Sequence, residues 1–142
     1  MNLYKLLPEQ VMQYWEDIRQ CIKVALPPMV ADNDAAILHI QEQLLLGSLE
    51  CWMAEDNGIC GVMTTQLVID SVSRCLNMLI YTVAITSEHS EELWEMGAVH
   101  LRKYAIARQC TNIIAYSNNP QMIHIAERLG ADSSYRLLTF KL

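Results

Sequence analysis

The chain has 142 residues, of which 52% are hydrophobic and 18% are charged. This length suits one domain with its own core, so we expect residues 1–142 to form a single domain. A formal net charge of −6 with no local basic patch argues against binding to nucleic acid.

Targeting segments and metal sites are not expected either. The longest uncharged runs, 57–69 and 75–87, are shorter than the ~20 apolar residues of a membrane-spanning helix, so we predict no membrane association. The N-terminus lacks the pattern of a signal peptide, which favours a cytoplasmic location. The five cysteines stand singly, without a C-x-x-C pair, and no histidines have ligand spacing, so we predict neither a disulfide framework nor a metal site.

The first half of the chain predicts helices followed by a hairpin. A short strand is expected near 2–6, and helical spacing of apolar residues predicts a first helix over 8–25. A second helix should begin after the capping region 32–34 and end at Gly47. Two strands, 50–54 and 59–69, flank Asn57-Gly58, a pair that is typical of a tight hairpin turn.

The second half predicts a strand, helix, strand, helix, strand order. The almost unbroken apolar run 76–85 is typical of a central strand, and the helix over 90–108 should connect it to a parallel strand over 111–116. The last helix has Asn119 as its N-cap, Pro120 in its first turn and Gly130 as its stop. Residues 135–142 are expected to form the final strand.

This order, β-α-α-β-β-β-α-β-α-β, predicts an α/β (α+β) fold with one mixed central sheet flanked by helices. It resembles the GNAT superfamily of N-acetyltransferases over nearly the whole chain. The most specific local match is Asn119 to Gly130-Ala131, which resembles the family's N-x-x-A-x-x-x-Y-x-x-x-G-F helix.

The resemblance implies an acetyl-CoA site where the two parallel strands separate. The strand backbone would pair with the pantetheine arm, and the start of the helix at Ser90 would face the pyrophosphate. The residues that this resemblance assigns to the cofactor are Val83, Ala84, Ile85, Ser87, His89, Ser90 and Asn119.

The same loop departs from the family's R/Q-x-x-G-x-G/A pattern. Residues 86–90 contain no glycine and no Lys or Arg, and Glu88 stands where an anion should bind. A carboxylate ~6 Å from a phosphate charge repels it by ~0.7 kcal/mol in water and by up to ~3 kcal/mol at an effective dielectric of 20. Glu91 and Glu92 follow in the first helical turn, where acidic residues are common because they complement the helix dipole.

The residue that protonates the leaving thiolate is also missing. Counting back from Gly130, the family's tyrosine position is Ala126, and the aromatic after the glycine is Ala131. Tyr81 or Tyr116 is a substitute acid, and Tyr116 is the candidate catalytic residue because it lies near the end of its strand. The alternative is that both tyrosines only pack.

Two functional hypotheses remain open. We favour a non-catalytic binding or assembly module with a degenerate acetyl-CoA loop, which needs no cofactor and acts with a protein partner or a second copy. The segment from Asn119 to Phe140 also resembles small GNAT-like virion proteins of short-tailed phages, so a virion is a second expected location. The alternative is an active acetyl-CoA-dependent N-acetyltransferase with a nonstandard pyrophosphate loop.

Overall fold

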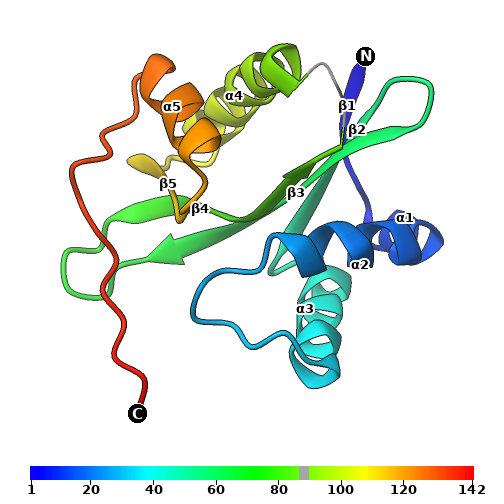
Figure 1. Cartoon of the computed structure of the whole chain (residues 1–142), viewed down its shortest axis with the longest axis horizontal. Coiled ribbons are helices and arrows are strands. Elements are labelled where there is room, and N and C mark those ends of the chain that lie inside the picture. The colour runs from blue at the N-terminus through cyan, green and yellow to red at the C-terminus, as the bar shows by residue number, and fades with distance from the viewer. Residues whose placement is uncertain (87–89) are drawn as a thin grey trace.

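A five-stranded sheet in the order β1-β2-β3-β4-β5 forms the centre of the fold (Figure 1). The structure is a computed structural model that describes residues 1–86 and 90–142. Its elements are β1 (Asn2–Lys5), α1 (Pro8–Gln13), α2 (Trp15–Val24), α3 (Asp34–Leu46), β2 (Glu50–Glu55), β3 (Ile59–Ile69), β4 (Leu76–Ile85), α4 (Ser90–Ala107), β5 (Asn112–Ala115) and α5 (Pro120–Arg128). The predicted α+β class is confirmed.

Helices cover the two faces of the sheet separately. In Figure 1, α1, α2 and α3 lie on one side of the strands, and α4 and α5 lie on the other. The larger apolar cluster is on the α1–α3 side, where Ile18 and Ile22 of α2 are 0% exposed and pack with Val11 of α1. On the other side, Leu101 and Ala105 of α4 are buried against the sheet.

The turns and helix ends follow the expected local chemistry. The Asn33 side chain caps α3 by accepting a hydrogen bond from the Ala36 amide at 2.8 Å, and Gly47 ends that helix at a φ of 81°. Between β2 and β3, Asn57 and Gly58 have φ values of 55° and 132°. These positive values are those that an Asn-Gly turn supplies with little strain.

Strand directions also agree with the sequence pattern. The pairs β1–β2, β2–β3 and β3–β4 are antiparallel, whereas β4 and β5 are parallel. The apolar strand β4 therefore lies inside the sheet, between β3 and β5.

Two predicted elements are wrong. The helix expected over 8–25 is broken at Tyr14, whose ψ of 16° separates α1 from α2. Val11 and Ile18, on either side of the break, belong to the same apolar cluster. The strand expected over 135–142 is absent, because no described strand pairs with this segment and all of its residues are exposed.

Candidate functional site

A bulge in β4 creates the main irregularity of the sheet. Thr64 of β3 pairs with Thr82, but its neighbour Thr65 pairs with Ile80, so Tyr81 is an extra residue on β4. An extra residue bends its strand and increases the local twist. The bulge therefore turns the second half of β4 away from its earlier direction.

The bend coincides with the point where β4 and β5 separate. The last β4–β5 pair joins Ile80 to Ala115, while β4 continues to Ile85 along β3. Within the described part of the chain, no strand pairs with the β5-facing edge of residues 81–85. This edge offers backbone donors and acceptors to a ligand that lies along it.

A groove of about 470 Å³ lies beside this free edge. This volume is in the range of small-molecule sites. Its wall is formed by Val83, Ala84, Ile85 and Thr86 from the end of β4, Trp94 of α4, Asn119, Gln121 and Met122 at the start of α5, and Gln20, Cys21, Val24 and Ala25 around the end of α2. Segments far apart in the sequence thus meet at one groove.

The groove brings together four of the residues predicted to bind the cofactor, namely Val83, Ala84, Ile85 and Asn119. Ser90 is the first residue of α4. The predicted positions Ser87 and His89, and Glu88 between them, lie outside the described residues. The roles of all these residues stay predictions.

Asn119 has a structural task at the edge of the groove. Its side-chain oxygen accepts hydrogen bonds from the amides of Gln121 at 3.0 Å and Met122 at 3.4 Å, which caps α5. Because the side-chain oxygen of Asn119 accepts these two hydrogen bonds, its side-chain NH2 group is the part that remains for a ligand.

Ionisable side chains are scarce on this wall. Of the residues that line the groove, only Cys21 titrates, and burial, followed by the charge of Asp17, raises the pKa of its thiol. Within residues 1–86 and 90–142, the wall therefore contains no carboxylate, imidazole or phenol for proton transfer. Tyr116, the predicted acid, is 41% exposed just after β5 and is not part of this wall, so its catalytic role stays a prediction.

The acidic start of α4 is partly neutralised. Arg128 of α5 donates a hydrogen bond to the Glu91 carboxylate, which holds the pKa of Arg128 above its ordinary value. Arg102 of α4 donates to the Leu129 carbonyl, so two arginines join α4 to α5. The sequence pattern predicted only a helix-dipole role for Glu91, because this ion pair links residues 37 positions apart.

Comparison with solved structures identifies the fold. A ribosomal-protein-alanine N-acetyltransferase from Brucella melitensis biovar Abortus 2308 matches with a TM-score of 0.72 at 10% identity, over 100% of both chains. A predicted acetyltransferase from Clostridium acetobutylicum, solved with acetyl-CoA, has a TM-score of 0.72 at 16% identity over 99% of this chain and 95% of that one. This chain has the GNAT fold.

A third GNAT-fold structure contains a ligand built on CoA. It is the acetyltransferase AAC(6')-Iy in complex with the bisubstrate analogue CoA-S-monomethyl-acetylneamine, with a TM-score of 0.74 at 14% identity over 99% of this chain and 97% of that one. By sequence, no protein-family model and no curated protein matches the chain. The GNAT assignment therefore concerns the fold and leaves the reaction to be argued from the site.

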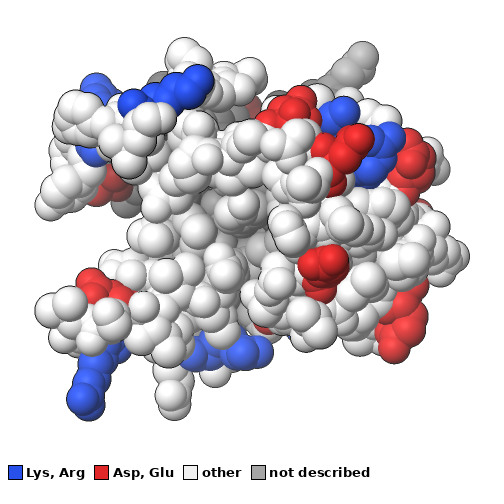
Figure 2. Space-filling model, turned by 90° about the horizontal axis from the view of Figure 1, so that it is seen from below, with Lys and Arg blue, Asp and Glu red and all other residues white. Residues whose placement is uncertain are grey.

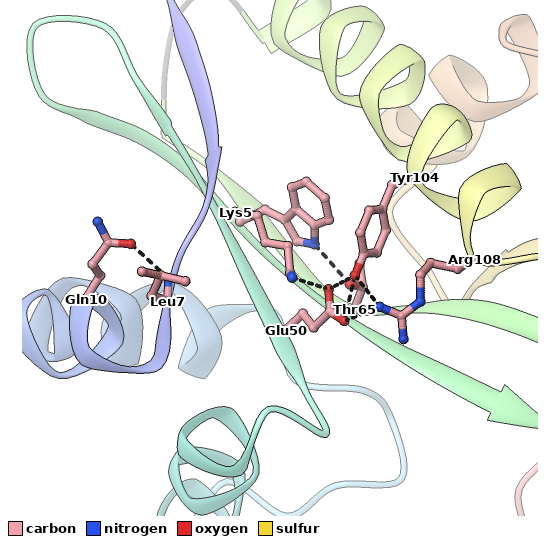
Figure 3. Close-up of polar contacts among 8 residues, drawn as sticks. Lys5, Leu7, Gln10, Glu50, Thr65, Tyr104 and Arg108 are labelled. Carbon is pink, nitrogen blue, oxygen red and sulfur yellow. Dashed lines mark hydrogen bonds and ion pairs between the residues drawn. The ribbon is translucent and has the colours of Figure 1, made fainter.

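A polar cluster on the α4 side of the sheet was missed by the sequence analysis (Figure 3). The Tyr104 hydroxyl donates to the Glu50 carboxylate, with oxygen–oxygen distances of 2.6 and 2.8 Å, and accepts from Arg108 at 3.1 Å. Lys5 lies 3.5 Å from the same carboxylate, and the Trp52 ring meets the Tyr104 ring edge-on at 5.0 Å between centroids. In the sequence, only the spacing of Tyr104 and Arg108, one helical turn apart, indicates that two of these side chains can meet.

The contacts of this cluster join secondary-structure elements to one another. Burial, and then the hydrogen bond and charge of Glu50, raise the pKa of Tyr104, so the phenol stays protonated and donates to the carboxylate. None of its residues lines the groove. The cluster fastens the C-terminal half of α4 to β1 and β2.

No helix in the described ranges combines the length and apolarity needed to cross a membrane. The described residues also contain no group of three or more His, Cys, Asp or Glu side chains arranged to hold a metal ion.

Proposed function

We propose that this protein is a GNAT-fold binding module that does not transfer an acetyl group. The observation that carries the proposal is the groove wall, where the Cys21 thiol is the only ionisable side chain that the described residues contribute. Acetyl transfer to an amine needs a group that removes the amine proton and a group that protonates the leaving thiolate. A thiol with a raised pKa is a poor candidate for either task at neutral pH.

The last helix supports the same proposal. Ala126 occupies the position at which the resemblance places the family's tyrosine, and its methyl group can donate no proton. The residues at Ala126 and in the loop around Glu88 differ from the family's pattern independently, and both differences weigh against acetyl transfer.

None of the similar structures named above is a virion component, so the virion setting stays a prediction.

The groove nevertheless fits part of acetyl-CoA. The unpaired edge of β4 at residues 83–85 suits the amides of a pantetheine arm, and the side-chain NH2 group of Asn119 adds hydrogen-bond donors. Acetyl-CoA, when bound, would supply an acyl group activated as a thioester. The retained groove therefore favours a second candidate function, an acetyl-CoA-dependent N-acetyltransferase that takes and gives its protons through water.

Calorimetric titration with acetyl-CoA separates the two candidates. The binding-module proposal predicts no binding at millimolar concentration and no release of free thiol when amine acceptors are added. Micromolar binding together with thiol release would overturn it and establish the enzyme.

A matched pair of variants shows whether any observed binding uses the groove. Gln20→Trp fills the α2 side of the wall, whereas Gln13→Trp adds the same side chain to an exposed position at the end of α1. If acetyl-CoA binds in the groove, Gln20→Trp should abolish binding and Gln13→Trp should leave it unchanged. Equal binding by both variants would place the ligand elsewhere.

A further inference from the structure

Helix α3 has apolar side chains on a second face, outside the core. Its buried residues are Ile37, Ile40 and Leu44, and they belong to the larger apolar cluster. Leu38 and Leu45 are 52% and 39% exposed. They stand seven residues apart, which is two helical turns, so both lie on the same side of the helix. A helix that packs on one side normally has polar residues at such positions. Packing of the core therefore does not explain these two leucines.

Helix α1 extends this apolar surface. Met12 is 52% exposed, and its sulfur accepts a hydrogen bond from the side-chain nitrogen of Gln41 at 3.7 Å. Gln41 stands between Leu38 and Leu45 on α3, three residues after the first and four before the second. Three apolar side chains thus lie around one amide group, and we call Met12, Leu38 and Leu45 the α1–α3 strip. The strip is separate from the groove, because none of these three residues belongs to the groove wall.

The two helices that carry the strip are acidic. Together α1 and α3 contain Glu9, Asp34 and Glu42 and no Lys or Arg. Figure 2 views the molecule from the side on which these helices lie, and it shows a surface that is largely uncharged, with acidic side chains in separate places. An apolar strip flanked by carboxylates attracts a partner with apolar and positive groups and repels a negative one.

The charge of the two helices decides between the surfaces that an apolar strip commonly meets. A second copy placed on the same strip by a two-fold axis would bring two sets of these carboxylates together, and like charges oppose that contact. An anionic membrane is repelled for the same reason, and membrane-surface helices use Lys and Arg, which α1 and α3 lack. A basic segment of another protein is therefore the favoured occupant.

The shape of the surface favours a helix as that segment. Backbone groups inside helices are already paired, so an extended strand would find few partners on α1 and α3. A helix brings its own backbone hydrogen bonds and contributes only side chains. Apolar residues at positions i, i+3 or i+4 and i+7 of such a helix span ~10 Å, the rise from Leu38 to Leu45.

We propose that the α1–α3 strip docks an amphipathic helix of a protein partner, with apolar residues on the strip and Lys or Arg residues beside the carboxylates of α1 and α3. The proposal goes beyond the proposed function, because it assigns a second surface and holds whether or not the groove binds acetyl-CoA. Three partly exposed side chains are far fewer than the ~20–30 residues that each partner contributes to a stable interface, so the complex is transient.

Fluorescence anisotropy with the full chain and a labelled model helix tests the docking. The probe is a peptide of leucine and lysine with all its leucines on one helical face. One control peptide has the same composition in scrambled order, and the other has glutamate in place of lysine. We expect only the leucine–lysine helix to bind, and its binding should weaken as salt is added. No binding at millimolar concentration, or equal binding of either control, would overturn the proposal.

A matched pair of variants identifies the surface. Leu38→Lys should weaken binding of the probe about tenfold or more, because it removes an apolar contact and adds a repelling charge. Val99→Lys on α4 is the control, since Val99 and Leu38 are both 52% exposed and the change in net charge is the same. In Figure 1, α4 lies on the other side of the sheet from α3.

The control variant should bind the probe as the parent does, and unfolding in urea checks that both variants fold. Equal weakening in the two variants would mean that net charge, and not the strip, holds the peptide. Sedimentation equilibrium covers the remaining case. A parent chain that forms a dimer, and a Leu38→Lys variant that does not, would mean that a second copy occupies the strip. Either result overturns the proposal.

Discussion

The buried threonine pair beside the β4 bulge gives the sharpest test of the fold energetics. Thr64 is 0% exposed and Thr82 is 3% exposed, and their hydroxyl oxygens lie 2.6 Å apart. Valine has nearly the same shape and replaces the hydroxyl with a methyl group. A single Thr→Val change leaves the other hydroxyl buried without its partner, which costs about 1–3 kcal/mol.

The double variant should behave differently from the sum of the two. With both hydroxyls removed, no buried polar group is left without a partner. The free energy of unfolding of Thr64→Val/Thr82→Val should therefore lie within about 1 kcal/mol of that of the parent. Urea unfolding followed by tryptophan fluorescence gives the free energy of unfolding for all four proteins. Additive single changes, with no coupling free energy, would refute the hydrogen bond as the reason for the pair.

Three further predictions concern the core, a cap and a thiol. Ile18→Ala should lower the free energy of unfolding by about 2–5 kcal/mol, because the side chain is 0% exposed and leaves a cavity; a smaller loss in urea would mean that the core collapses around it. Asn119→Ala should cost about 1 kcal/mol through the lost α5 cap, whereas Asn119→Asp should retain most of it in the same measurement. Burial raises the pKa of Cys51 from 9.0 to about 12, so the folded state keeps a proton that the unfolded state releases. Its contribution is complete below pH 9 and falls by up to about 1.4 kcal/mol per pH unit toward pH 12. Unfolding titrations from pH 8 upward should show a shallower decline for Cys51→Ala, and parallel curves would contradict this.

Local chemistry explains why most of the fold was predictable. The stop at Gly47 and the turn at Asn57-Gly58 depend on backbone angles that few residues adopt, so the sequence marks them directly. The parallel pairing of β4 and β5 follows from the length of the connecting helix. By contrast, the break at Tyr14 has no glycine or proline to announce it, and tertiary packing decides it.

The candidate site was only partly predictable for a similar reason. The fold order indicated a crevice at the end of β4, and a groove lined by Val83 and Asn119 lies there; that these residues bind a cofactor stays a prediction. The ion pair of Glu91 with Arg128 and the contact of Glu50 with Tyr104 span 37 and 54 positions. No local pattern encodes such contacts. The final strand was mispredicted because 135–142 has strand composition but meets no strand within its own chain.

The bulge at Tyr81 has a consequence for the groove. It frees main-chain groups of β4, and every amino acid except proline carries the same main-chain donor and acceptor. A groove edge built from such groups tolerates replacement of almost any side chain around it. This chain has the fold of a solved acetyltransferase over its full length at only 10% identity. In other chains of this fold whose side chains differ, the displaced strand register should therefore be easier to detect than any residue signature.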